Sequence, residues 1–452
     1  MEIVIDFSSI PTTDPIAFAW WFFKTIGWIF PVFLFVYGLV LLYQNWIRNE
    51  YRRKRSYILL AIDIPRDNEQ SPRAVQNMFQ HLSGAHQPLK FHHKWWKGEV
   101  PESFSFEIVS IGGYIQFIIH TEKHYRDFIE ALVYAQYPDA EITEVEDYVD
   151  KYKSVKFPHN KYQLFGSELK LTAKEYYPLI TFKEFEDTLA QELKDPMSGI
   201  LESMSRMGPG EEMWVQFLVT PADNDWKKTS GAQAEIDKIV VARKKTKNNW
   251  FDWVFQIPNF IIEGLNPAPV AVKVEKDEPV NQMLNLTQGA KDTVTSIEHK
   301  TAQTGFHTRI RYVYIAEHEK FNKMKAFQAI YGAFKQFNSL GSNGLKNDSR
   351  YFTAAVVYFK KIRLIWRRNK LLYRYRYRGH WLSPGEYGPI LISEELASLW
   401  HFPTITTKAP MVQKTEAKKA EPPTSLPTES TNPIKAVQPQ IAKSSPPENL
   451  PT

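Results

Sequence analysis

The chain has 452 residues, of which 43% are hydrophobic and 14% aromatic, so it can bury substantial cores and is not disordered throughout. It contains no cysteine, which excludes disulfides, thiolate metal sites and cysteine nucleophiles. The formal net charge of +6 favours an anionic neighbour, either lipid headgroups or nucleic acid.

An uncharged segment near the N-terminus, residues 25–47, is almost wholly apolar. About 20 such residues span a bilayer, so we expect a transmembrane helix here, kinked at Pro31. A cleaved signal peptide is disfavoured because the apolar run is too long and its basic residues follow it instead of preceding it.

A basic segment, residues 48–56, follows the expected helix and holds Arg48, Arg52, Arg53, Lys54 and Arg55. Residues 1–24 carry three acidic residues and a single lysine. Because basic flanks stay in the cytoplasm, we expect a single-pass protein with its N-terminus outside and its remaining mass inside. The basic segment is expected to contact the anionic lipid of the inner leaflet.

Residues 57–150 show the order strand, helix, strand, strand, helix, strand. The paired glycines Gly112 and Gly113 predict a hairpin, and Ser71-Pro72 is typical of a helix start. The strands are predicted at 57–64, 104–110, 114–121 and 140–145, and the helices at 71–83 and 123–136. This is the order of a ferredoxin-like unit, in which two helices cover one face of an antiparallel sheet.

Residues 151–403 predict the same order again, with a helical insertion at about 221–304. Strands are expected at 167–182, 213–219, 308–316 and 351–359, a helix opens at Asp195-Pro196, and another covers 322–337. The predicted fold class is therefore α+β, with two ferredoxin-like units behind one transmembrane helix. Residues 404–452 contain nine prolines and no aromatic residue, which predicts a disordered tail.

No catalytic motif is found in the sequence. The chain has no Gly-Lys dipeptide and therefore no P-loop, and it lacks the His-Glu-x-x-His and Gly-x-Ser-x-Gly patterns. We therefore predict a protein that is not an enzyme, with no catalytic residue, no cofactor and no metal site. The pair Glu394 and Glu395 is interpreted as ordinary surface or helix-start charge.

A basic aromatic stretch, residues 360–378, holds nine positive charges and no acidic residue. Tyrosine and arginine alternate from Tyr373 to Arg378, which predicts a strand with arginines on one face and tyrosines on the other. Such a surface could bind phosphates and stack on bases. A basic strand facing anionic lipid or an acidic protein is the alternative. The candidate contact residues are Lys360, Lys361, Arg363, Arg367, Arg368, Lys370, Arg374, Arg376 and Arg378.

A second aromatic segment lies in the insertion and combines Trp250, Phe251, Trp253 and Phe255 with basic residues just before it. Such a segment can lie in the membrane interface or contact a partner. A helix packed on the protein's own surface explains it equally well.

Several phrases of the sequence resemble the N-terminal, membrane-anchored, non-motor region of bacterial conjugation-type (type IV secretion-like) ATPases. They are Phe106–Tyr114, Tyr134–Glu141, Ile297–Lys300 before Gly305-Phe306, Tyr314–Ala316 and Ile392–Pro403. In those ATPases the last phrase leads into the nucleotide-binding motor. Here the Pro-rich tail follows instead, so ATP hydrolysis is not carried over and no catalytic residue transfers.

The resemblance implies a non-catalytic scaffold or accessory component of a translocation apparatus in the bacterial inner (plasma) membrane. Its expected partners are a separate motor ATPase and other secretion-apparatus subunits, and self-association into a homo-oligomer stays open. The alternative function is a membrane-tethered nucleic-acid-binding protein that uses residues 360–378, where basic and aromatic side chains interleave.

Overall fold

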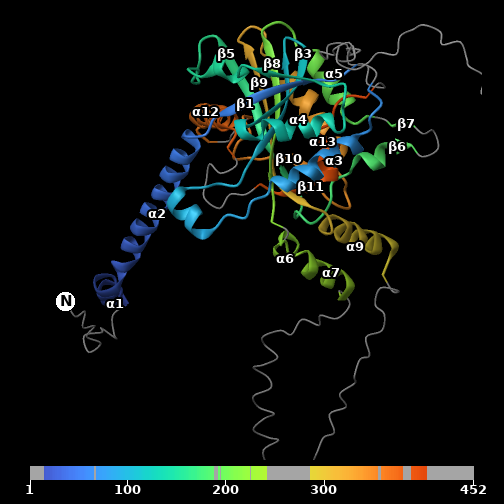
Figure 1. The fold of residues 1–452 in the computed structure, drawn as a ribbon. Coiled ribbons are helices and arrows are strands. Elements are labelled where there is room, and N and C mark those ends of the chain that lie inside the picture. The colour runs from blue at the N-terminus through green and yellow to red at the C-terminus, as the bar shows by residue number, and fades with distance from the viewer. Residues whose placement is uncertain are drawn as a thin grey trace, which may run out of the picture. The chain divides into compact units, whose positions relative to one another are not determined.

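The computed structural model describes residues 15–65, 68–187, 192–193, 195–223, 225–241, 286–354, 358–379 and 388–404. The fold is α+β, with an antiparallel sheet flanked by helices, and it is drawn in Figure 1. Residues 242–285 and 405–452 lie outside the described residues, and so do the predictions made for Trp250, Phe251, Trp253, Phe255 and the tail.

Helix α2, Ile29–Arg53, is long and apolar enough to cross a membrane, and in this respect it stands alone among the described residues. The rest of the protein covers none of its most apolar window. A π-helical turn, Phe23–Gly27, separates α2 from the short helix α1, Pro15–Phe22. Pro31 is the third residue of α2, where its missing N–H leaves no hydrogen bond unmade, so the helix continues through it.

The first half of the sheet, residues 57–145, has the strand order β2-β3-β1-β4, and every pair is antiparallel. The glycines of the β2–β3 hairpin, Gly112 and Gly113, both have positive φ, as a tight turn requires. The predicted strands and helices of this half are all confirmed, as β1 Tyr57–Asp63, α3 Pro72–Leu82, β2 Phe104–Ile111, β3 Tyr114–Glu122, α4 Arg126–Tyr134 and β4 Glu141–Val145.

The second half has the same order when it is read from the opposite edge: β8, β9, β5 and β10 correspond to β2, β3, β1 and β4. The elements are β5 Tyr162–Leu171, α5 Ser198–Ser205, β8 Glu211–Pro221, β9 Gly305–Glu317, α10 Lys323–Ala326, α11 Gly332–Phe334 and β10 Leu345–Asn347. The insertion between β8 and β9 begins with α6 Trp226–Thr229 and α7 Ala232–Val241 and ends with α9 Gln288–Thr301. A separate two-stranded ribbon pairs β6 Glu186–Asp187 with β7 Glu192–Leu193.

Two predicted strands of this half are wrong in position. The first strand ends at Leu171, and residues 182–185 form a 3₁₀ turn. The last strand is β10, which precedes the predicted segment 351–359; Tyr351 itself lies in a turn that begins at Asp348. Phe182 and Phe352 of these segments pack against the core of the sheet instead of belonging to a strand.

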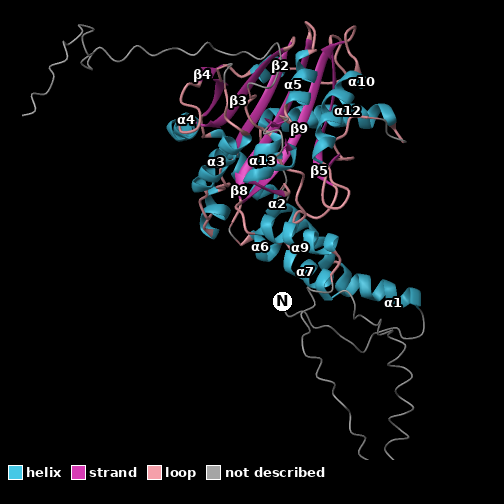
Figure 2. Ribbon diagram, turned by 90° about the vertical axis from the view of Figure 1, so that its right-hand side faces the viewer, coloured by secondary structure: helices cyan, strands magenta, loops and turns pink. Residues whose placement is uncertain are grey.

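The two halves join edge to edge through β2 and β8, which pair antiparallel from Phe104 opposite Val219 to Ile111 opposite Glu212. The result is one continuous sheet, and Figure 2 shows its strands side by side with α5 and α13 lying across them. Alternate residues of each strand serve separate cores: Leu60 belongs to the core beneath α3, and Leu59 to the core that includes α12.

The C-terminal segment completes the first of these cores. Strand β11, Ile390–Ile392, pairs with β9, and helix α13, Ser393–Leu399, packs against α3. The fully buried ring of Trp400 lies 5.0 Å from that of Phe106 in β2. Residues 392–403 therefore contribute to the core of the sheet.

Candidate functional site

The basic aromatic stretch is a helix. Helix α12 covers Lys360–Tyr377, so the predicted strand with arginines on one face and tyrosines on the other is wrong. Residues four apart share one face of a helix, which is why the ring of Tyr373 packs at a tilt against that of Tyr377, with centroids 4.2 Å apart. The helix packs on β5 through buried Leu371, Leu372 and Tyr375.

The nine basic residues of this stretch have three different environments. Lys360, Lys361 and Arg363 are exposed at the N-terminal end of α12. Arg374 and Arg378 are buried beneath the helix. The intermediate positions are Arg367, Arg368, Lys370 and Arg376, of which Arg367 donates to the carbonyl oxygen of Phe352 and Arg376 to that of Lys153. A uniform nucleic-acid-binding face along this stretch is therefore not formed.

Glu168 of β5 holds the last turn of α12 through buried charge. It accepts hydrogen bonds from Arg309 and Arg311 of the neighbouring strand and forms an ion pair with Arg374 at 3.4 Å. Burial alone would raise the pKa of Glu168, but the three guanidinium groups lower it to about 2. Arg374 therefore supports the fold and is not available to an external phosphate.

Arg378, the residue that follows α12, holds the same C-terminal end to β2. It donates to Glu107 of β2 at 2.7 Å and to Asp147 at 2.6 Å. Burial would raise the pKa of Glu107, yet the Arg378 charge and its hydrogen bonds bring that pKa below its usual range. Arg378 itself adopts a left-handed backbone conformation, φ +45°, that ends α12.

A pocket of about 440 Å³ lies where the end of α2 meets the end of α12. It brings together basic residues that the sequence places more than three hundred positions apart. Five arginines and two carboxylates line it: Arg52, Arg53, Arg55, Arg376, Arg378, Glu102 and Asp147. The other lining residues include Asn49, Tyr57, Ser103, His120, Tyr373 and Tyr377. We call this the basic pocket.

Arg55 is a structural part of the wall of the basic pocket. It forms ion pairs with Glu102 and Glu122, each at 2.7 Å, and donates to the Tyr51 hydroxyl. Burial would lower the pKa of Arg55, but the hydrogen bond and charge of Glu102 raise it above its usual range. Its charge is thus neutralised within the protein, and it fixes the end of α2 to the sheet.

Arg52 forms no ion pair with a carboxylate among the described residues. Its side chain is partly buried, and burial lowers its pKa. Arg53 reaches Glu50 only at 3.5 Å, on the solvent side. A partly desolvated guanidinium gains most from an anion that forms charge-assisted hydrogen bonds, and phosphate fits its fork geometry.

Three neutral residues also line the basic pocket, and one of them, His120, was not indicated by the sequence. Tyr373 and Tyr377 form an aromatic pair on its wall, and burial raises the pKa of Tyr373, so that its hydroxyl stays protonated and can donate. Burial, aided by the charge of Arg378, brings the pKa of His120 well below its usual range. The four-residue spacing of the tyrosines is the sequence signal that would have indicated a helix.

Several predicted contact residues lie away from the basic pocket. The exposed lysines at the start of α12 are not among its lining residues, and Lys54 is exposed beside it and forms a 3.8 Å ion pair with Glu50. Arg48 lines a separate, smaller pocket of about 180 Å³ with His86 and Lys94.

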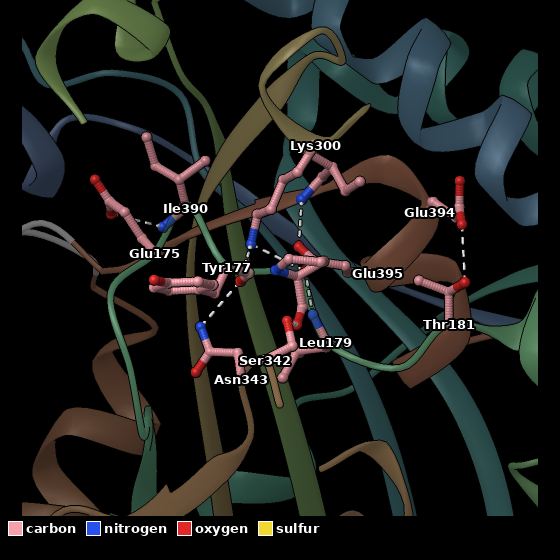
Figure 3. A network of polar contacts seen from close by, with 12 residues as sticks. Glu175, Tyr177, Leu179, Thr181, Lys300, Ser342, Asn343, Ile390, Glu394 and Glu395 are labelled. Carbon is pink, nitrogen blue, oxygen red and sulfur yellow. Dashed lines mark hydrogen bonds and ion pairs between the residues drawn. The ribbon is translucent and has the colours of Figure 1, made fainter. Parts of the chain in front are cut away.

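A second polar cluster, drawn in Figure 3, is buried around α13. Lys300 donates to Glu395 at 2.9 Å, and both side chains are fully buried. Glu395 also accepts from the backbone N–H groups of Leu179 and Ile392. Glu394 accepts from Thr181 at 2.8 Å.

These contacts correct the expectation that Glu394 and Glu395 are ordinary surface charges, although both do lie in the first turn of a helix. Their oxygens are used up in fixing the C-terminal segment, which makes this cluster a structural one.

Comparison with known proteins gives the chain a family without a function. No curated protein matches the sequence. A family model does match, over residues 44–415, a range that includes the sheet, α12, α13 and every residue of the basic pocket. The chain therefore belongs to the family described as a domain of unknown function (DUF8128).

Proposed function

We propose that the protein is a non-catalytic, membrane-anchored scaffold of a type IV secretion or conjugation-like translocation apparatus, working with a separate motor ATPase. The observation that carries the proposal is α2, an apolar helix uncovered by protein that leads directly into the first strand of a large sheet. The resemblance of the five sequence phrases to the non-motor region of conjugation-type ATPases supplies the kind of apparatus.

The proposed location is the bacterial inner membrane, with the N-terminus outside and the sheet in the cytoplasm. The support is the charge asymmetry: basic residues follow the apolar run of α2, and acidic residues dominate before it. A reporter enzyme fused after Pro403 should be active only in the cytoplasm. Activity of a periplasmic reporter at the same position would reverse the orientation.

The two halves of the sheet are proposed to be ferredoxin-like units. In each half the first strand lies between the third and the fourth, and the second lies outside the third: β2-β3-β1-β4 and β10-β5-β9-β8. This arrangement, with a helix after the first and the third strand, is what the ferredoxin-like order requires.

The basic pocket is proposed to hold the phosphate of an anionic lipid headgroup from the inner leaflet. Arg52 offers a charge without a carboxylate partner among the described residues, and it lies on α2 just beyond the apolar run, at the level where headgroups are found. Tyr373 and Tyr377 offer hydroxyl donors beside it.

The scaffold proposal is tested by crosslinking in cells. A single photoreactive residue at exposed Ile362 or Trp366 can report contacts of this surface. We expect a crosslink to a P-loop ATPase. The same residue introduced at Leu201, which is fully buried, is the control. If Ile362 and Trp366 gave no crosslink to an ATPase above this control, the scaffold proposal would be rejected.

Nucleic-acid binding is the second candidate, and one observation favours it. The first two turns of α12 expose Lys360, Lys361 and Arg363 beside Ile362 and Trp366, so basic and aromatic groups are adjacent on a free surface. The salt dependence of DNA binding, compared between the wild type and a variant without these three charges, tests this candidate.

A further inference from the structure

A short helical segment between α3 and β2 exposes large apolar side chains. Residues 91–98 read Phe-His-His-Lys-Trp-Trp-Lys-Gly, and we call them the aromatic turn. Phe91 is 69% exposed and Trp96 is 64% exposed, although both are among the residues that a protein most readily buries. Lys94 and Lys97 of the same segment are also exposed.

The aromatic turn is internally ordered. The rings of His92 and Trp96 stack with centroids 5.3 Å apart, and those of Phe91 and Trp95 lie 5.7 Å apart. His93 Nδ1 lies 2.8 Å from a carboxylate oxygen of Glu99, which closes the turn. The exposed rings are therefore held in a fixed arrangement and lose little conformational freedom on binding a partner.

The aromatic turn contacts α2 at one defined position along the helix. Gly98 has φ +69°, and a Cβ placed on it would lie 2.1 Å from Cγ2 of Ile47 and 2.6 Å from the Ile47 carbonyl oxygen. Only glycine allows this approach, and Ile47 is the one well-buried residue among the described side chains of α2. The contact defines where along the anchor helix the aromatic turn lies.

The contact with Ile47 lies at the end of the apolar run of α2. At 1.5 Å per residue, the path from Ile29 to Ile47 is about 27 Å long, close to the thickness of about 30 Å of a bilayer's hydrocarbon core. Ile47 is the last residue before Arg48, with which the basic flank begins. The aromatic turn thus meets α2 where the hydrocarbon ends and the headgroups start.

We propose that the aromatic turn is a second membrane contact, which inserts Phe91 and Trp96 into the cytoplasmic interface of the bilayer while Lys94 and Lys97 meet anionic headgroups. Aromatic rings favour this zone, and lysine ammonium groups reach the phosphates above it. The inference rests on the proposed anchoring by α2. A helix and a docked turn give two points of attachment, which restrict rotation of the sheet about the anchor.

The test uses full-length protein in liposomes that contain anionic lipid and a lipid-attached quencher placed just below the headgroups. Single cysteines at three positions carry an environment-sensitive fluorophore: Trp96→Cys in the aromatic turn, Tyr114→Cys as control and Leu34→Cys in α2. Tyr114 is matched to Trp96 because it is also a 64% exposed aromatic residue. Tyr114 is the first residue of β3. The other end of β3 pairs with Tyr57 near α2, so Tyr114 lies at the end of the strand that is far from α2.

The label at position 96 is expected to shift to shorter emission wavelength and to lose most of its intensity to the lipid quencher, whereas the label at 114 keeps its intensity. If position 34 is quenched and position 96 behaves like 114, the aromatic turn is not a membrane contact but the anchor stands. If position 34 is not quenched, the anchor fails, and this inference fails with it. A label at 96 that is shielded from both lipid and aqueous quenchers would indicate a protein partner and overturn the inference.

A second variant tests how the aromatic turn is held. Gly98→Val adds a side chain where Ile47 leaves no room. In this background, quenching at position 96 should fall while quenching at position 34 stays unchanged. Equal quenching at 96 with and without the substitution would contradict docking on Ile47.

Discussion

The two ends of α12 carry the same kinds of residue and have opposite surroundings. At the N-terminal end, Lys360 and Arg363 extend into solvent. At the C-terminal end, Arg374 and Arg378 are buried on carboxylates of the sheet. A run of basic residues therefore does not define a binding surface by itself, because buried carboxylates beneath the helix consume part of the charge. Charge that forms no ion pair with a carboxylate, as at Arg52 among the described residues, is available to a ligand.

The sharpest test of this contrast is Arg378→Gln at the buried end. The substitution leaves Glu107 buried without its main counter-charge, and breaking such a pair costs about 3–5 kcal/mol of unfolding free energy. Denaturant unfolding of the full-length protein in detergent, followed by tryptophan fluorescence, measures the decrease. The double variant with Glu107→Gln should recover part of it, and a single variant as stable as the wild type would show that the buried end is not held by charge.

Glu168, the buried carboxylate that pairs with Arg374, makes the stability of the protein depend on pH. The pKa of Glu168 is about 2 in the folded protein, below its ordinary value of 4.5, so its contribution is complete above pH 4.5 and is lost as the pH falls towards 2. The contribution amounts to at most about 3 kcal/mol. Unfolding measured between pH 6 and pH 2 should show a shallower decline for Glu168→Gln. An unchanged slope would contradict the assignment.

A smaller effect is expected from the basic pocket. Replacing Arg52 by Gln should weaken binding of a short-chain anionic phospholipid by about 1 kcal/mol, or about fivefold in Kd, because one charge near the headgroup is removed. Titration of the detergent-solubilised protein measures the Kd, with a zwitterionic short-chain lipid as reference. Lys360→Gln, outside the pocket, is the matched control. Equal weakening by the two variants would indicate unspecific attraction.

The smallest effect belongs to the exposed end of α12. Replacing Lys360, Lys361 and Arg363 together by Gln should change the unfolding free energy by no more than about 0.5 kcal/mol. The same variant examines the second candidate function. If this end binds DNA, the slope of log affinity against log salt should drop by nearly one for each phosphate that the variant no longer neutralises. Identical slopes for variant and wild type would remove nucleic acid from consideration.

Most of the first half of the sheet could be predicted from the sequence because each of its elements has a local signal. A short continuous apolar run indicates β1, paired glycines indicate the hairpin between β2 and β3, and Ser71-Pro72 indicates the start of α3. The second half was predicted less well. Its last strand, β10, has only three residues, and it is a strand only because β5 lies beside it.

The environment of α12 could not be predicted for a similar reason. Alternating tyrosine and arginine fit a strand over six residues, whereas the buried Leu371, Leu372 and Tyr375 show the helical spacing only over the whole segment. That Glu107 and Glu168 would lie beneath it depends on strand pairing far away in sequence. The basic flank of α2 was predicted, but its meeting with α12 in one pocket requires the tertiary fold.

The burial of Trp400 and Phe402 has a consequence for how the chain is made. The ring of Phe402 lies 5.2 Å from that of Phe117 in β3, yet the ribosome synthesises these two residues nearly three hundred positions apart. Helix α2 leaves the ribosome long before Trp400 and Phe402 are synthesised. One face of the sheet therefore stays incomplete until these last aromatic residues are made. Under the proposed anchoring by α2, tethering therefore precedes completion of the core, and a chain that stops before Trp400 would leave this apolar sheet face uncovered beside the membrane.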